Sequence, residues 1–358
     1  MAILCAPLLF CTISLKEVDS ERHSRLAKNA QGLGEFIRVL NFTLKRGATN
    51  GQGLQVYRML AHMPNVRSLT VIHEREDTTA HTSFLTILDR FSHLESIKLQ
   101  EKNYDLAFNS LPHRNVKVSQ TFFHQFLHKV VDLHGQRLKV LCLYTLLPLS
   151  EVLYVKIRDF TPNLRHITLT GNIDVDLRLR FAESIPWASG KSGSLESLTL
   201  HNCAGVHAGN FVQNVLCGVY GNQIKLIHLV ACGYSQTDIP FIPVASTPAH
   251  VTVDRLHLDH MSEWELEALS RIPVRDLSLT RLLHDDVFQL PTLLARGFVG
   301  LKKLRFDRRM ASYEAWEMIS KATGGAYKEV QVSCLHRGVE LRFDAVAWPN
   351  GCTGHIHI

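Results

Sequence analysis

A short apolar motif occurs three times in succession in the middle of the chain. The copies begin at Leu164, Leu195 and Ile224, and each has apolar residues at its first, fourth and sixth positions. The ninth positions hold Asn172, Cys203 and Cys232. Because side chains alternate between the two faces of an extended segment, the fourth and sixth residues share one face and their neighbours point to the other. Each copy therefore predicts a short strand with one apolar face and one polar face.

The apolar triplet recurs along the whole chain. Its first positions are Phe10, Ile37, Val66, Leu94, Leu138, Leu164, Leu195, Ile224, Val253, Val274, Leu301 and Tyr327. Intervals that favour a helix lie at residues 54–63, 83–91, 121–133, 150–160, 208–219, 262–269 and 313–321. Most copies are spaced at about the 20–29 residues of a leucine-rich repeat. Strand followed by helix, repeated, predicts an α/β leucine-rich-repeat solenoid (horseshoe) with a parallel sheet on the concave side and mainly helices on the convex side.

We expect residues 1–358 to form a single leucine-rich-repeat solenoid domain. Each repeat of a solenoid packs only on its neighbours, so one body can reach this length. The interval between Leu94 and Leu138 is longer than the others and predicts an irregular insertion around 101–120. Residues 344–358 are expected to form a C-terminal cap or tail. Within the core, Leu198 and Ile227 are expected to be fully buried.

Composition argues against nucleic-acid and membrane partners. The 39 basic and 33 acidic residues leave a net charge of +6, a small excess for a nucleic-acid binder. No stretch of about 20 apolar residues could span a bilayer. The eight cysteines are scattered, without a Cys-x-x-Cys pair, which is typical of reduced intracellular thiols. We therefore expect a monomer in the cytoplasm, the nucleus or both.

The sequence offers no motif for catalysis, a cofactor or a metal. Gly190-Lys191-Ser192 resembles the end of a phosphate-binding loop, but the earlier glycine of that motif is replaced by Ile185. The histidines and cysteine of the last seven residues lack a second cluster at zinc spacing. We therefore expect a protein that is not an enzyme and that has no catalytic, cofactor-binding or metal-binding residues.

The residues between the motif's leucines define the candidate binding site. They are expected to lie on the concave face, where Asp276 also falls. The candidate partner-binding residues are Tyr144, His166, His201, His228, Arg255, His257, Asp259, Lys303, Arg305 and Asp307. Polar residues cover any exposed sheet face, but solenoids also use this face to bind extended partners. The mixture of aromatic, histidine and charged residues suits a protein partner better than a small-molecule pocket. Tyr144 and Arg305 are the expected hot spots.

Several segments resemble fungal F-box proteins with leucine-rich repeats. They are residues 7–15 and 34–40, and the helix-to-strand junctions at residues 62–69 and 160–167. In that family an F-box binds the adaptor subunit of a cullin-RING ubiquitin ligase, and the repeats hold the substrate. The resemblance implies a substrate-recognition module for such a ligase. It covers the repeat region only, since no F-box-like segment precedes Pro7, so adaptor binding is expected only if an F-box is restored upstream. The alternative is a stand-alone protein-interaction scaffold.

Overall fold

The computed structural model describes twelve stretches of the chain and the single residue 266. The stretches are residues 11–16, 34–44, 59–73, 81–101, 116–144, 151–170, 196–201, 225–230, 253–259, 269–280, 284–307 and 326–344. The chain divides into two compact units, Met1–Ile167 and Thr168–Ile358. The single-domain organisation expected from the sequence stays a prediction.

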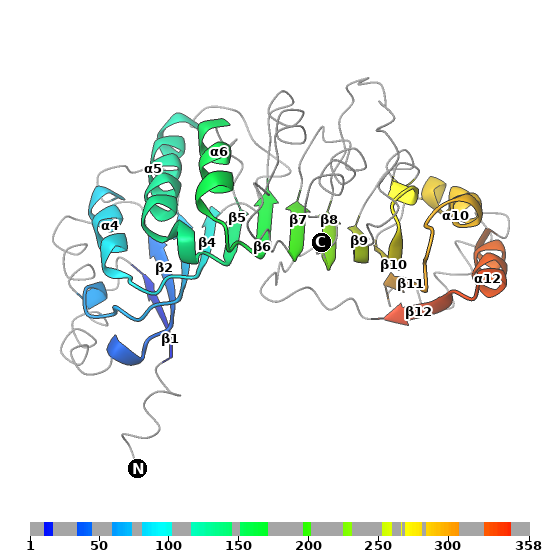
Figure 1. The fold of residues 1–358 in the computed structure, drawn as a ribbon, viewed down its shortest axis with the longest axis horizontal. Coiled ribbons are helices and arrows are strands. Elements are labelled where there is room, and N and C mark those ends of the chain that lie inside the picture. The colour runs from blue at the N-terminus through cyan, green and yellow to red at the C-terminus, as the bar shows by residue number, and fades with distance from the viewer. Residues whose placement is uncertain are drawn as a thin grey trace, which may run out of the picture. The chain divides into compact units, whose positions relative to one another are not determined.

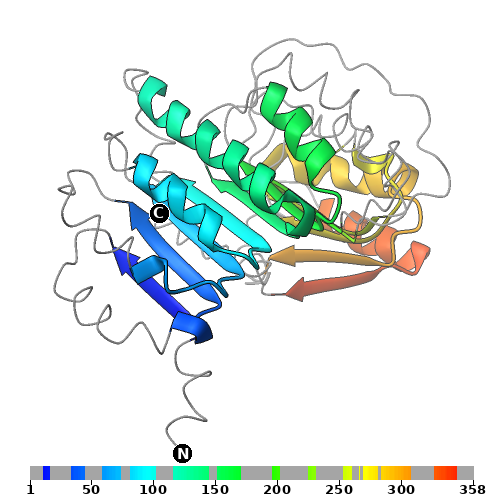
Figure 2. The same cartoon turned by 60° about the vertical axis from the view of Figure 1, so that its left-hand side comes forward.

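Unit 1 is built from parallel strands with helices on one side. Its strands are β1 (Thr12–Lys16), β2 (Val39–Leu44), β3 (Ser68–His73), β4 (Ser96–Glu101), β5 (Val140–Tyr144) and the start of β6 (His166–Thr170). Its helices are α4 (His81–Ile87), α5 (Val116–His134) and α6 (Glu151–Phe160), with 3-10 turns at Gly34–Phe36, Leu88–Arg90 and Gly135–Arg137. The strands pair in register, so Leu40, Leu69 and Ile97 lie side by side. Figures 1 and 2 show α4, α5 and α6 on one side of these strands.

A stack of aromatic rings joins the sheet of unit 1 to its helices. Phe42 of β2 stacks on Phe84 of α4 with ring centroids 5.1 Å apart, and Phe84 faces Phe126 of α5 at 6.1 Å. All three side chains are fully buried. The helices cover the face of the sheet that carries the leucines of the motif, because that face is apolar. We call the opposite side of the sheet the open face.

Asparagines at the turn before two strands of unit 1 hold neighbouring repeats together. The Asn65 side chain donates a hydrogen bond of 2.9 Å to the backbone carbonyl of Glu35, one repeat earlier. Asn163 does the same to the carbonyl of Gln136 at 2.7 Å. Carbonyls in a turn have no strand partner, so these side chains satisfy groups that the sheet leaves open. The two helix-to-strand junctions that resemble each other in sequence therefore share a hydrogen-bonding role.

Gly135 lies where the backbones of two repeats approach closely. A Cβ atom at this position would clash with the backbone carbonyl oxygen of Phe160, at the end of α6. We expect Gly135→Ala to lower the free energy of unfolding by about 1–3 kcal/mol, because the backbone of one repeat must move away. Urea denaturation measures this loss, with Gln136→Ala at the neighbouring exposed position as the control. Equal urea midpoints for the Gly135 and Gln136 variants would show that the backbone at this junction can move without loss of stability.

His134 is a buried titratable group at the end of α5. Its Nε2 donates a hydrogen bond of 3.1 Å to the carbonyl oxygen of Leu88, which requires the Nε2–H tautomer. Burial lowers the pKa of His134, and the positive charge of Arg137 lowers it further. The hydrogen bond to Leu88 and the charge of Asp89 act in the opposite direction. The net effect is a pKa below the ordinary value, so the folded protein resists protonation of this ring.

This lowered pKa predicts that unit 1 loses stability in mild acid. The unfolded chain takes up a proton on His134 near pH 6.5, whereas the folded chain does so only at lower pH. The stabilisation is therefore complete above about pH 6.5 and is lost as the pH falls towards the folded pKa. Urea denaturation at pH 7.5 and at pH 5.5 measures the free energy of unfolding. We expect the decrease between the two pH values to be smaller for His134→Gln than for the parent. An identical pH dependence in both proteins would mean that His134 does not contribute.

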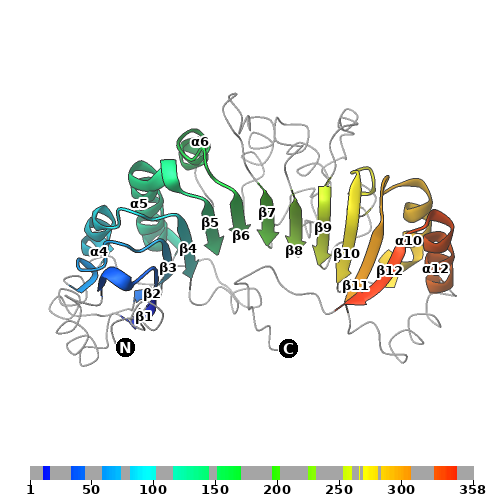
Figure 3. The ribbon, with the colours of Figure 1, turned by 60° about the horizontal axis from the view of Figure 1, so that its bottom comes forward.

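Unit 2 repeats the arrangement. Its strands are β7 (Ser197–His201), β8 (Leu226–Val230), β9 (Val253–Asp259), β10 (Val274–Thr280), β11 (Lys303–Asp307) and β12 (Glu340–Asp344). Its described helices are α10 (His284–Arg296) and α12 (Ala326–Arg337). In Figure 3 both helices lie on the same side of β10, β11 and β12. Leu198 and Ile227 are buried, which confirms their predicted place in the core.

The described strands confirm the predicted fold class, an α/β leucine-rich-repeat solenoid. Within each unit neighbouring strands pair in parallel and in chain order, from β1 to β5 in unit 1 and from β7 to β12 in unit 2. Eleven of the twelve predicted motif copies coincide with strands β1 to β11. The physical basis is the alternation seen in β2 and β3, where every second side chain is buried.

The twelfth predicted strand, at Tyr327, is wrong. Tyr327 lies in α12, and β12 follows that helix. The register of β12 with β11 gives it the motif positions Leu341 and Phe343. The first position, three residues before Leu341, is Gly338, with φ of +64°. A glycine in place of the expected apolar residue hid this copy of the motif.

The helix predictions were partly confirmed. The helices expected at 83–91, 121–133 and 150–160 are α4 with the turn after it, α5 and α6. Helix α5 begins at Val116, so it includes the last residues of the predicted insertion. Helix α10 was not predicted, and it contains Pro291, which removes a backbone donor from a helix. Several predictions lie outside the described residues. They are the helices expected at 208–219 and 313–321, most of the helices expected at 54–63 and 262–269, and the tail after residue 344.

Candidate binding face

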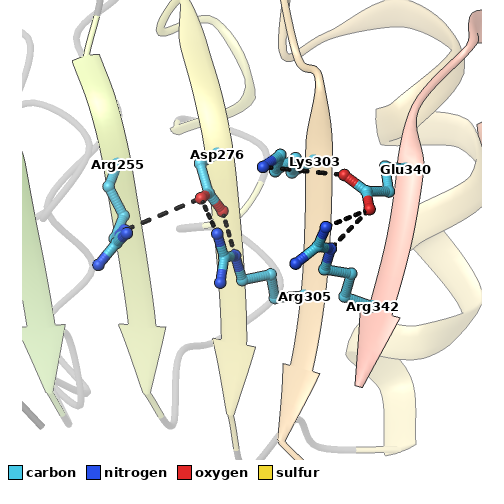
Figure 4. Close-up of polar contacts among 6 residues, drawn as sticks. All are labelled: Arg255, Asp276, Lys303, Arg305, Glu340 and Arg342. Carbon is cyan, nitrogen blue, oxygen red and sulfur yellow. Dashed lines mark hydrogen bonds and ion pairs between the residues drawn. The ribbon is translucent and has the colours of Figure 1, made fainter. Parts of the chain in front are cut away.

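Charged side chains form an array on the open face of strands β9 to β12 in unit 2. The register places Arg255, Asp276, Lys303 and Glu340 side by side in one row across the four strands. Two residues further along the strands, Arg305 lies beside Arg342 in a second row. Figure 4 shows how the side chains of the two rows reach one another. We call these six residues the charged array.

Asp276, on β10, is the first of the two anions of the charged array. Arg305 binds it through two hydrogen bonds, Nε to Oδ1 at 2.9 Å and Nη2 to Oδ2 at 2.6 Å. The Asp276 side chain is 13% exposed, so this two-pronged pair is partly shielded from water. Such paired contacts hold an arginine in one orientation. Arg255 approaches the same carboxylate from the other side, with Nε 3.8 Å from Oδ2.

Glu340, on β12, is the second anion of the charged array. Its Oε1 accepts a hydrogen bond of 2.6 Å from Nε of Arg342, and Lys303 lies 3.8 Å from its Oε2. The hydrogen bond from Arg342 lowers the pKa of Glu340, and the charges of Arg342, Lys303 and Arg305 lower it further. Glu340 is therefore a carboxylate at neutral pH. Each anion of the array thus has one close guanidinium and one more distant cation.

The charged array has more positive than negative groups. Four cations and two carboxylates give a local charge of 4 − 2 = +2. Arg255 and Lys303 each approach a carboxylate of the array at 3.8 Å, and their side chains are 55% and 39% exposed. Arg342 is 44% exposed. The outer cations therefore remain accessible to water and to a partner.

Another set of ion pairs lies where the strands begin. It comprises Lys139 with Glu95 at 2.9 Å, Lys225 with Glu196 at 3.0 Å and Arg275 with Asp254 at 2.9 Å. Lys225 and Arg275 each lie two residues before a buried apolar residue of the motif, so they do not alternate onto the open face. Exposed pairs of this kind contribute about 0–1 kcal/mol each. They provide cations of comparable exposure outside the charged array.

The structure brings three of the predicted site residues together. Arg255, Lys303 and Arg305 belong to the charged array. Glu340 and Arg342 were missed, because the last strand was predicted at Tyr327 instead of β12. A search that allowed glycine at the first position of the motif would have found them. Their part in binding a partner stays a prediction.

Two predicted site histidines are not exposed on the open face. The rings of His228 and His257 stack with centroids 4.3 Å apart, and both side chains are buried. Nε2 of His257 also lies 3.3 Å from Oγ1 of Thr280. Adjacent parallel strands lie about 4.8 Å apart, so residues in register can stack face to face and remove one another from water. The expectation that these rings are open to a partner is therefore corrected.

The predicted hot spot Tyr144 is also largely covered. It lies at the end of β5 in unit 1 and is buried, and the Lys98 ammonium is 4.8 Å from its ring centroid. This cation–π contact occupies a face of the ring that a partner would otherwise use. His166 of β6, by contrast, is exposed. His201, Asp259 and Asp307 lie on β7, β9 and β11, and their side chains are outside the described part of the structure.

The described residues contain no group of three or more histidine, cysteine, aspartate or glutamate side chains arranged to hold a metal ion. Among the described helices, none is long and apolar enough to cross a membrane.

Among known proteins, similarity to this chain is found at the level of solved structures. No protein-family model matches the sequence, and no curated protein does either. Among solved structures, this chain is similar to the leucine-rich-repeat-containing protein LegL7 from Legionella pneumophila. The match covers 87% of this chain and 98% of that chain, with 14% sequence identity and a TM-score of 0.44. The fold assignment therefore rests on the motif and strand register of this chain itself.

Proposed function

We propose that this protein is a protein-interaction module whose partner binds the open face of the sheet. The observation that carries the proposal is the charged array, in which ion pairs orient Arg305 and Arg342 before any partner arrives. Side chains that are already ordered lose less conformational freedom on binding. Arginine is also enriched among the residues that dominate binding energy at protein interfaces. A fixed, half-exposed, charged surface suits a protein partner.

Site-specific photo-crosslinking tests this proposal. A photoreactive phenylalanine replaces Arg255 or Lys303 on the open face, and in matched proteins it replaces Ala295 of α10 or Val332 of α12, which are exposed on the helices. We expect one protein to crosslink from the open face only, and to bind the parent chain when both are purified. A partner that crosslinks from the helix positions and not from the open face would contradict the proposal.

The resemblance to fungal F-box proteins supports a narrower version, in which the bound partner is a substrate of a ubiquitin ligase. The resemblance includes the helix-to-strand junctions at Asn65 and Asn163, where each side chain donates a hydrogen bond to a backbone carbonyl of the preceding repeat. A stand-alone scaffold is the alternative. The test uses the intact gene product. Its co-purification with a cullin-RING adaptor, together with ubiquitination of the crosslinked partner, would support the ligase role. A partner bound without either outcome would favour the scaffold.

A further inference from the structure

We propose that the charged array binds an acidic, extended peptide segment of its partner, with two carboxylates about three residues apart. This inference rests on the proposed function and adds the chemistry of the partner. It starts from charge: the array has a local charge of 4 − 2 = +2. A partner segment with two negative charges would neutralise it.

The two cations available for such a segment are Arg255 and Lys303. Arg305 and Arg342 each have a carboxylate at 2.6 Å or closer, whereas the ion pairs of Arg255 and Lys303 are both 3.8 Å long. At 3.8 Å and with half-exposed side chains, these pairs are weakly held. A carboxylate from outside can therefore approach either cation without disrupting the close pairs.

The register sets the spacing that the partner must match. Arg255 of β9 and Lys303 of β11 both align with Asp276 of β10, so they lie two strand spacings, or about 10 Å, apart. A polyproline II peptide has three residues per turn and rises about 3.1 Å per residue. Its residues i and i+3 therefore project from the same side about 9 Å apart. Such a peptide, lying across the strands, brings one carboxylate to each cation.

A protein segment fits the array better than a nucleic acid does. Non-specific binding of single strands combines a basic groove with aromatic side chains on which bases stack. None of the six residues of the array is aromatic, and the carboxylates of Asp276 and Glu340 alternate with Arg255 and Lys303 along the row, where a continuous line of phosphates would meet them. Two carboxylates that contact only Arg255 and Lys303 lie on either side of Asp276 and do not reach Glu340.

The test is a titration of the full chain with fluorescent peptides, followed by anisotropy in buffer of low ionic strength. The probe is (Glu-Pro-Pro)4, which favours the polyproline II conformation and places carboxylates three residues apart. The matched peptide is (Gln-Pro-Pro)4. The array variant is Arg255→Gln with Lys303→Gln, and the control is Lys225→Gln with Arg275→Gln, which removes the same charge from the strand starts. Circular dichroism establishes that both variants are folded.

We expect the glutamate peptide to bind at least tenfold more tightly than the glutamine peptide. The array variant should lose at least tenfold in affinity, and the control variant less than threefold. Equal binding of the two peptides, or equal losses in the two variants, would overturn the proposal. So would tighter binding of a (dT)12 oligonucleotide that is lost in the array variant, since this would assign the array to phosphates. The titration uses no cellular partner, so a negative result here leaves the crosslinking test of the open face standing.

Discussion

Phe84→Ala is expected to lower the free energy of unfolding by about 3–5 kcal/mol, the range for removing a buried phenylalanine side chain. Phe84 is the middle ring of the stack that links β2, α4 and α5. Its removal opens a cavity between sheet and helices, and it ends two ring contacts that contribute beyond the buried area. Phe42 and Phe126 are themselves fully buried, so neither ring can fill the gap without leaving its own contacts.

Urea denaturation followed by circular dichroism measures this effect. Phe160→Ala is the matched control, because the same side chain is removed from a position that is 51% exposed. We expect the control to lose clearly less stability than the Phe84 variant. If both variants unfold at the same denaturant concentration, the aromatic stack is not a main element of the unit 1 core.

Leu198→Ala is expected to lower the free energy of unfolding by about 2–5 kcal/mol. Leu198 is the fourth residue of its motif copy in β7, and the register places it beside Ile227 of β8. Both are buried, so the substitution loses the transfer free energy of the side chain and leaves a cavity beside Ile227. This is the effect expected of any fourth-position residue if the motif defines the core.

Leu335→Ala serves as the control for Leu198, since Leu335 of α12 is 81% exposed and loses the same atoms. Thermal and urea denaturation should show a large shift for the first variant and a shift within about 0.5 kcal/mol for the second. A Leu198 variant that melts like the parent would contradict the assignment of the motif to the core.

The candidate site was only partly predictable from the sequence. Arg255, Lys303 and Arg305 were placed on the open face correctly, because alternation along a strand is a local property. The exposure of His228 and His257 was predicted wrongly, because it depends on a ring stack between strands about thirty residues apart in the chain. Alternation tells which face a side chain occupies, but it does not tell what covers that face.

The sequence by itself determined the repeat, the positions of β1 to β11 and the face on which each leucine lies. These features follow from the spacing of apolar residues that are only a few positions apart. Burial of all these side chains on one side requires one arrangement of strand and helix. The tertiary structure alone decided the place of β12, where Gly338 replaces the apolar residue of the motif. It also decided that Arg305 pairs with Asp276 while Arg255 and Lys303 stay exposed. Those contacts depend on register between strands that are distant in sequence, and register is set only when the whole sheet has formed.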